Sequence, residues 1–330
     1  MMIQVDNLTK YFGPVMAIDR VTFGVDKGEI VGFLGLNGAG KTTTMRILTS
    51  YLPATSGIAR VAGFDVMTES LDVRRNIGYL PESVPLYPEM RVEEYIVFRA
   101  KLKGVPRKER IGRVEYCLER CRLKEVRRRL IGTLSKGYRQ RVGLADAMIH
   151  DPAILILDEP TSGLDPMQIR ETLALIKELG ENHTVLLSTH ILPEVEAICE
   201  RVIIIAGGRV SFSRTLADIE SQAVILLETR APADQVAGVL RGIPGVAQVT
   251  ENQGEDGVAG FTIRTEENSD LREPISKAVG AKGWPIRRLD RKRGSLDDAF
   301  FDVLRAQDPL KEVLPSTAAR PMVDTGVTTP

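Results

Sequence analysis

Residues 35–42 read Gly-Leu-Asn-Gly-Ala-Gly-Lys-Thr, which fits the glycine-rich pattern GxxxxGK[ST]. Glycines let successive backbone N–H groups curl around phosphate oxygens, and the helix-like stretch that follows adds unpaired amides and a positive dipole end. Lys41 can reach the β- and γ-phosphates, and the Thr42 hydroxyl can ligate Mg²⁺. The alternative is an ordinary glycine-rich turn. The pattern favours a nucleoside triphosphate site, with contacts from Gly35, Asn37, Gly38, Ala39, Gly40, Lys41, Thr42 and Thr43.

Two adjacent acids, Asp158 and Glu159, follow the apolar run of residues 153–157. Their carboxylates are expected at the carboxyl end of a buried strand, the edge at which open α/β sheets bind ligands. Asp158 suits Mg²⁺ coordination, and Glu159 is then free to orient or deprotonate an attacking water. An acidic pair after a strand is also a common helix cap or surface turn. Together with the phosphate-binding loop, the pair favours hydrolysis of the triphosphate.

With these motifs, the sequence resembles the nucleotide-binding subunits of ABC transporters from residue 3 to about residue 211. Residues 134–142 (Leu-Ser-Lys-Gly-Tyr-Arg-Gln-Arg-Val) resemble the signature motif of that family, and residues 162–165 (Ser-Gly-Leu-Asp) resemble its D-loop. Residues 188–190 (Ser-Thr-His) match its switch histidine, and Tyr11 matches its adenine-stacking aromatic. Each short motif is weak alone, whereas their order along one chain is specific.

The resemblance implies that two such subunits sandwich two ATP molecules head to tail, as a homodimer or with a paired ATPase subunit, and that ATP and Mg²⁺ are the cofactors. Ser135 and the Gly137 amide, at a helix N-terminus, would meet the γ-phosphate across the interface. Asp165 of the D-loop would also contact nucleotide. His190 would align the water at the γ-phosphate, the alternative being a structural strand-end imidazole. Tyr11 would stack on adenine, the alternative being a core aromatic.

The sequence departs from the family pattern at two positions. Glu82, in Gly-Tyr-Leu-Pro-Glu, stands where the family usually has a glutamine that contacts Mg²⁺ and the water. A glutamate keeps an oxygen for the metal but loses the amide donor. We therefore keep Glu82 among the catalytic and metal-binding residues and expect Glu82→Gln to remain active. The signature reads Ser-Lys-Gly-Tyr instead of Ser-Gly-Gly-Gln, so we expect Lys136 to bring an extra cation toward the phosphates.

The elements around these motifs predict an α/β fold, a P-loop NTPase of ABC type with a helical insert. Short apolar runs alternate with helical patterns and glycine-rich turns, which is typical of a mainly parallel sheet. Residues 153–157 and 184–188 are continuous rather than alternating runs, as expected of strands covered on both faces. Residues 93–150 change to long charged helices and form the predicted insert. We expect this ATPase domain to span residues 1–216.

After residue 216 the sequence predicts a small α+β domain over residues 217–305. Strand-like segments 223–229, 246–250, 258–265 and 284–289 alternate with helix-like segments 234–241 and 269–279. That order is βαββαβ, the ferredoxin-like pattern. A last helix follows Ser295, which can cap it together with Asp298, and Leu296, Phe300 and Leu304 then share one face. Residues 306–330 are rich in Pro, Thr, Val and Ala, which favours disorder.

Composition limits the partners. Lys plus Arg and Asp plus Glu both total 44, so the formal net charge is +0 and we expect no nucleic-acid partner. No apolar run approaches the roughly 18 to 20 residues that cross a bilayer. Residues 1–12 lack the pattern of a secretory signal, so we expect a cytoplasmic protein. Cys117, Cys121 and Cys199 form no CxxC pair and are expected to be free thiols.

The predicted function is ATP hydrolysis that powers transport through a separate transmembrane permease. Because exporter-like systems commonly carry such a small C-terminal domain, the resemblance favours export. The chain is similar, among others, to drug, gliding-motility and copper-site exporter ATPases. The chain would lie on the cytoplasmic face of the inner or plasma membrane. In the family, a groove beside the insert and the segment after Glu82, here residues 84–90, contacts the permease. The basic side chains of the insert are either a solvated helix face or part of that contact. The alternative function is a non-transport, ATP-switched regulator.

Overall fold

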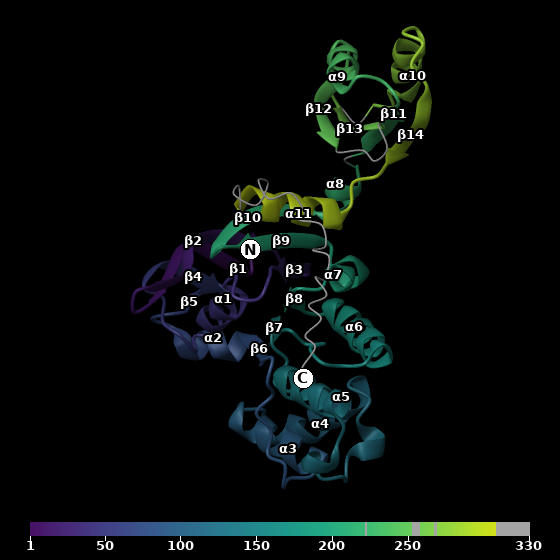
Figure 1. Cartoon of the computed structure of the whole chain (residues 1–330). Helices are drawn as coiled ribbons and strands as arrows, with labels where there is room; N and C mark the ends of the chain where they lie inside the picture. The colour runs from purple at the N-terminus through teal and green to yellow at the C-terminus, as the bar shows by residue number, and fades with distance from the viewer. Residues whose placement is uncertain (222, 253–257, 267–268, 308–330) are drawn as a thin grey trace, which may run out of the picture.

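The structure is a computed structural model that describes residues 1–221, 223–252, 258–266 and 269–307. Figure 1 shows a large lobe, which holds the N-terminus, and a small lobe at the top of the view. The predicted disordered tail lies outside the described residues from residue 308 onward. The motifs of the predicted nucleotide site are all in the large lobe.

A six-stranded sheet forms the centre of the large lobe. Five of its strands are parallel, and the edge strand β10 is antiparallel to β9. Residues 154 and 156 pack into one hydrophobic core and residues 155 and 157 into another, because successive side chains of a strand point to opposite faces. The prediction of a sheet covered on both faces is confirmed. The strand order is β10 (Arg209–Thr215), β9 (Arg201–Ala206), β3 (Ile30–Leu34), β8 (Thr184–Thr189), β7 (Ile154–Asp158) and β6 (Ile77–Leu80).

A second, antiparallel sheet lies on one side of the lobe (Figure 1). The helix α1 (Lys41–Leu48), which begins directly behind the glycine-rich loop, contacts strands of both sheets. Its buried Met45, Ile47 and Leu48 belong to the same core as the β1 and β2 side chains. The second sheet therefore holds α1, and with it the loop, against the central sheet. Its order is β2 (Val15–Val25), β1 (Ile3–Phe12), β4 (Ser56–Val61) and β5 (Phe64–Asp65).

The predicted helical insert is present at the end of the large lobe opposite the small lobe (Figure 1). Arg127, which follows η1, links this turn to α3 and α4, because its guanidinium pairs with Glu93 at 2.5 Å and with Glu115 at 2.6 Å. The α2 helix (Ser70–Asn76) precedes the insert in the chain, and α6 (Pro166–Gly180) and α7 (Leu192–Ile198) follow it. The insert consists of α3 (Val92–Leu102), α4 (Arg107–Arg120), the 3₁₀ turns η1 (Lys124–Val126) and η2 (Ile131–Thr133), and α5 (Lys136–Met148).

The small lobe has the strand and helix order that the sequence predicts. Its sheet is antiparallel throughout, in the order β12-β13-β11-β14. Both helices contribute to one core on the sheet, which includes Val236, Phe261 and Ile275. The elements, after the linking α8 (Leu216–Ser221), are β11 (Val224–Thr229), α9 (Ala233–Arg241), β12 (Val246–Asn252), β13 (Ala259–Thr265), α10 (Arg272–Gly280) and β14 (Ile286–Lys292).

The last helix, α11 (Leu296–Gln307), returns to the large lobe instead of packing in the small one. Leu296 is 2% exposed and Phe300 is 4% exposed, and both belong to the core that contains β9 and α7 side chains. Leu304 packs against the same core. Ser295 caps the helix, because its Oγ accepts the Asp298 amide at 3.2 Å. The predicted apolar face of this helix therefore joins the two lobes.

None of the helices among the described residues is long and apolar enough to cross a bilayer. The three cysteines are free, as predicted, and all are buried. Burial raises the pKa of the Cys117 and Cys199 thiols to about 12. These thiols are therefore protonated and unreactive at neutral pH.

Candidate functional site

The glycine-rich loop, the β7 end and the β8 end meet at one cavity of about 400 Å³. The loop follows β3, and because β3, β8 and β7 are parallel neighbours, their carboxyl ends lie at the same edge of the sheet. Nine predicted site residues line the cavity: Asn37, Gly38, Gly40, Lys41, Thr42, Thr43, Glu82, Glu159 and His190. Three residues that the sequence reasoning did not assign also line it: Ala17, Leu36 and Ser162.

The glycines of the loop are required by its backbone. Gly38 and Gly40 have φ angles of 82° and 108°, in the left-handed region that side chains rarely adopt. A Cβ on Gly35 would lie 2.4 Å from the Ile205 carbonyl oxygen, so no larger residue fits at the start of the loop. Gly35 and Ala39 are not among the cavity-lining residues. Gly35 closes the loop onto β9, and Ala39 is buried.

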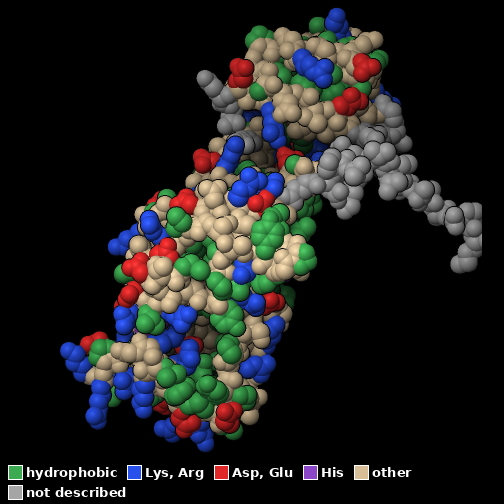
Figure 2. All heavy atoms as spheres, turned by 90° about the vertical axis from the view of Figure 1, so that its left-hand side faces the viewer, with side chains coloured by type: hydrophobic (Ala, Val, Ile, Leu, Met, Phe, Trp, Pro, Cys, Tyr) green, Lys and Arg blue, Asp and Glu red, His purple; other side chains and the backbone are tan. Residues whose placement is uncertain are grey.

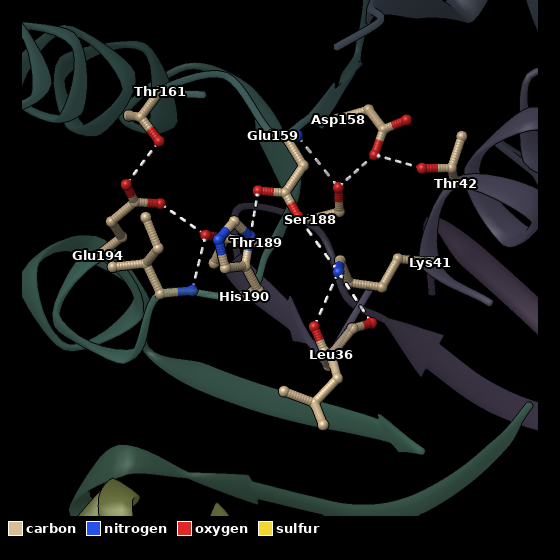
Figure 3. Close-up of polar contacts among 12 residues, drawn as sticks. Leu36, Lys41, Thr42, Asp158, Glu159, Thr161, Ser188, Thr189, His190 and Glu194 are labelled. Atoms are coloured by element: carbon tan, nitrogen blue, oxygen red, sulfur yellow. Dashed lines mark hydrogen bonds and ion pairs between the residues drawn. The ribbon is translucent and has the colours of Figure 1, made fainter. Parts of the chain in front are cut away.

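The Lys41 ammonium is buried within this loop (Figure 3). Its Nζ donates to the Gly35 carbonyl oxygen at 2.7 Å and to the Leu36 carbonyl oxygen at 3.3 Å. It also lies 3.2 Å from Glu159 Oε1. These groups hold a compact positive charge at the cavity wall, within the loop that would surround the phosphates.

The polar atoms around Asp158 indicate that a magnesium ion fits beside the phosphate-binding loop. Its side chain is buried, with Oδ1 accepting the Ser188 hydroxyl and, at 3.3 Å, the Thr42 hydroxyl, while Oδ2 has no hydrogen-bond partner. Burial raises the pKa of this carboxyl, and the hydrogen bonds from Ser188 and Thr42 oppose that shift. Among the described residues no cluster of three His, Cys, Asp or Glu side chains could hold a metal. A carboxylate and a hydroxyl fit Mg²⁺, which takes few protein ligands when phosphates supply others.

Glu159 is held in an uncommon conformation, with a φ of 48°. Its amide donates to the Ser188 carbonyl oxygen at 3.1 Å and to the Ser188 hydroxyl at 3.2 Å, so β8 fixes this turn of β7. The two carboxylate oxygens then point to Lys41 and to His190, whose Nδ1 lies 2.9 Å from Oε2 (Figure 3). The carboxylate lies at the cavity wall, between the ammonium and the imidazole.

Besides Gly35 and Ala39, four predicted contact residues lie outside the cavity of the single chain. Ser135 is the N-cap of α5, where its Oγ accepts the Tyr138 amide, and Gly137 lies in the first turn of that helix. Asp165 is the N-cap of α6. Tyr11 is 44% exposed at the end of β1. Helix caps explain the residue types at positions 135 and 165 without a ligand, so their contacts with nucleotide remain predictions.

The two departures from the family pattern lie in different places. Glu82 is exposed and lines the cavity, close to the phosphate-binding loop. Lys136 lies beside the D-loop of its own chain, and its predicted approach to the phosphates remains a prediction. Its Nζ lies so close to Gly163 that a Cβ on this glycine would be only 2.3 Å from Nζ. In the single chain, this extra cation therefore contacts the D-loop of the same molecule.

Ser188 is the main site residue that sequence reasoning left without a role. Its hydroxyl connects Asp158 with the Glu159 amide, so it fixes both acids. Its position in the Ser-Thr-His segment was a signal, because parallel strands place the end of β8 beside the end of β7. Ala17, by contrast, comes from the second sheet, and no motif indicates it.

A glycine-rich loop with a buried lysine, a paired hydroxyl and carboxylate, and a second acid at the cavity wall define a P-loop nucleotide-binding site. The ABC transporter family model matches residues 18–162. The chain is 33% identical over 305 residues to the uncharacterized ABC transporter ATP-binding protein YxlF of Bacillus subtilis (strain 168), covering 92% of this chain and 100% of that protein. The chain therefore belongs to the ABC transporter ATP-binding proteins, a family that binds and hydrolyses ATP.

Two further comparisons each cover about two thirds of the chain. The bacitracin transport ATP-binding protein BcrA of Bacillus licheniformis is 39% identical over 209 residues, covering 63% of this chain and 67% of that protein. A solved dimeric, post-hydrolysis structure of the ATP-binding cassette MJ0796, bound to ADP and Pi, has a TM-score of 0.59 and 27% identity. It covers 65% of this chain and 99% of that chain.

Proposed function

We propose that this chain is the ATP-hydrolysing motor subunit of an ABC transporter and acts through a separate membrane permease. We further propose that the direction of transport is export. The observation that carries the proposal is the arrangement of Lys41, Glu159 and His190 at the wall of the cavity that the glycine-rich loop forms. A buried cation can bind the phosphates, a carboxylate can act as general base, and an imidazole beside it can position that base for triphosphate hydrolysis.

In this mechanism the β- and γ-phosphates bind against the loop amides, and Lys41 exchanges its contact with Glu159 for a contact with phosphate oxygens. Glu159 is thereby freed to orient the attacking water and accept its proton. His190 stays beside Glu159 and the γ-phosphate and keeps both aligned. Thr42 and Asp158 would hold Mg²⁺, which neutralises charge on the phosphates when it is bound.

We further propose that two copies, or this chain and a paired ATPase subunit, close around two ATP molecules. Ser135, Gly137 and Asp165 lie at helix N-termini outside the cavity of their own chain, where the helix dipoles favour an anion. In a head-to-tail dimer these helix ends would complete the site of the partner. The dimeric state of MJ0796 with ADP and Pi supports this arrangement.

The proposed permease contact lies at the insert. Figure 2 shows apolar side chains gathered on this face over the lower part of the molecule, with basic side chains beside them. Tyr87 is 47% exposed and packs edge-on against Tyr95 and Phe98, so its ring is held in place at the surface. The segment that carries it, residues 84–90, begins two residues after Glu82. Movement at the nucleotide would therefore reach the permease through this segment. The same contact would hold the chain at the cytoplasmic face of the membrane.

Steady-state hydrolysis of Mg-ATP by the full chain tests the ATPase proposal. Loss of a general base should slow kcat by roughly 10² to 10⁴ in Glu159→Gln. Glu181→Gln, at the exposed C-cap of α6, is the matched control and should keep the wild-type rate. Equal rates for wild type and Glu159→Gln would contradict the assignment of the base.

The permease contact is tested by co-purification with a candidate permease. Arg128 is exposed, whereas Arg127 pairs with Glu93 and Glu115 inside the insert. We expect Arg128→Glu to weaken recovery of the complex while the ATPase rate of the isolated chain stays unchanged. Arg127→Glu should instead destabilise the insert. Full recovery with Arg128→Glu would show that this side chain does not contact the permease.

A further inference from the structure

A buried carboxylate beside the site connects two segments that each continue into it. Glu194 is 2% exposed, and each of its oxygens accepts one threonine hydroxyl (Figure 3). Oε1 accepts from Thr161 Oγ1 at 2.5 Å, and Oε2 accepts from Thr189 Oγ1 at 2.6 Å. Thr161 is two residues after Glu159, and Thr189 directly precedes His190.

A structural role at the start of α7 does not account for this arrangement. Glu194 lies in the first turn of that helix, where an acid is favourable. The Thr189 hydroxyl also accepts the Ile191 amide at 3.1 Å, which completes the local turn. Neither requirement involves Thr161, which is 33 residues away in sequence. Among the described residues, moreover, Glu194 has no ion pair, and a buried carboxylate without a cation is costly to keep.

Both threonines are embedded in the site. Thr161 is 2% exposed and begins the D-loop turn. In this turn the Leu164 amide donates to the Thr161 carbonyl oxygen, and the Ser162 amide donates to the Glu159 carbonyl oxygen. Ser162 lines the cavity. At the other end Thr189 is fully buried, and its hydroxyl holds the amide of Ile191, the residue after His190. Glu194 therefore sets the spacing between the turn after the proposed base and the imidazole that contacts the base.

The same D-loop turn is contacted from the signature segment. Lys136 Nζ lies against Gly163, and the Gln168 side chain lies against Gly137, where a Cβ would be 2.5 Å from its Oε1. The turn thus lies between the helix start proposed to face the partner's ATP and the carboxylate that holds the His190 segment. This is a contiguous set of contacts from one proposed site to the other.

We propose that Glu194 is a positioning residue that couples the state of the γ-phosphate, through the His190 segment, to the D-loop turn at 161–165 and so to the partner's site. The proposal rests on the composite ATP site proposed above. When the γ-phosphate leaves and His190 relaxes, the shared carboxylate transmits the shift to Thr161. The D-loop and the switch segment then move together instead of independently.

The test compares Glu194→Ala and Glu194→Gln with wild type in the full chain. Glu194→Ala should lower kcat by roughly 10- to 10²-fold through misplacement of the base. Its KM for ATP should stay within about threefold, because the loop that binds the phosphates is untouched. Glu194→Gln keeps one acceptor and should recover most of the rate. Hydrogen exchange of residues 161–165, which Mg-AMP-PNP should slow in the wild type, should no longer respond in Glu194→Ala.

Thr161→Val and Thr189→Val each remove one hydroxyl at nearly constant volume and keep the proposal testable if Glu194→Ala fails to fold. Both substitutions cut the same link, and Thr189→Val also removes the acceptor of the Ile191 amide. The double variant should therefore lose little more kcat than Thr189→Val alone. Independent, multiplicative losses would overturn the coupling, as would wild-type kcat and nucleotide-responsive exchange in Glu194→Ala. The proposed function itself would instead be refuted if the wild-type chain had no Mg-ATPase activity, or if Glu159→Gln did not lower that activity.

Discussion

The buried ion pair between Lys41 and Glu159 makes the nucleotide-free site a measurable part of the stability of the fold. The side chains are 5% and 8% exposed, and Nζ lies 3.2 Å from Oε1. At this distance and an effective dielectric constant of about 20, the attraction is about 5 kcal/mol before the cost of desolvation. Removing one partner leaves the other charge buried, which typically costs about 3 to 5 kcal/mol.

We therefore predict that Lys41→Met lowers the free energy of unfolding by about 3 to 5 kcal/mol in the absence of nucleotide. Glu159→Gln should cost less, about 1 to 3 kcal/mol, because the amide keeps hydrogen-bonding capacity. Once Lys41 is gone, Glu159→Gln removes an unpaired buried charge. The double variant should therefore be less destabilised than the sum of the single variants, by at least about 1 kcal/mol.

The assay is equilibrium urea unfolding of the full chain, followed by circular dichroism, for the wild type and the three variants. Lys177→Met is the matched control, because Lys177 is exposed on α6, and it should change stability by less than about 0.5 kcal/mol. Additive effects of the two site substitutions, within about 0.5 kcal/mol, would refute the buried pair as the source of the stabilisation.

Three further predictions follow from particular contacts. Glu82→Gln should keep Mg-ATPase activity, because the amide retains an oxygen for the metal, and an inactive variant would show that the carboxylate is required. Burial lowers the pKa of His150 to about 4 in the folded chain, from an ordinary value of about 6.5. Between pH 4 and pH 6.5 this imidazole is therefore protonated in the unfolded chain and neutral in the folded chain. Stability should be full above pH 6.5 and fall by up to about 3 kcal/mol toward pH 4, and His150→Gln should flatten that part of a urea-unfolding pH series. Phe300→Ala should lower the free energy of unfolding by about 3 to 5 kcal/mol, because the ring fills the core that joins α11 to the large lobe, and an unchanged urea midpoint would exclude that packing.

The sequence predicts the central sheet and the phosphate-binding loop because their signals are local. Residues 153–157 and 184–188 do not alternate between apolar and polar side chains. The structure has β7 there, shifted by one residue, and β8, extended by one residue. The order of the small lobe is also predicted, because its strands and helices differ in period and are separated by turn residues. Parallel pairing then brings Asp158, Glu159 and His190 together without any further information.

What the sequence does not predict depends on contacts between distant segments. No local pattern indicates that β1 and β2 belong to a separate sheet, or that Ala17 on β2 reaches the cavity. The apolar face of α11 is visible in the sequence, yet its partner, the large lobe, is not. In the same way, Glu194 resembles an ordinary acid at a helix start until the fold places Thr161 beside it.

The central claim is that two ATP molecules hold two such chains together. Light scattering on Glu159→Gln, with and without saturating Mg-ATP, tests it most directly, because slowed hydrolysis should accumulate the closed state. We predict a monomer without nucleotide and a dimer with Mg-ATP, and no dimer when Lys41→Met is added. A Glu159→Gln chain that binds Mg-ATP yet remains monomeric would contradict the composite site.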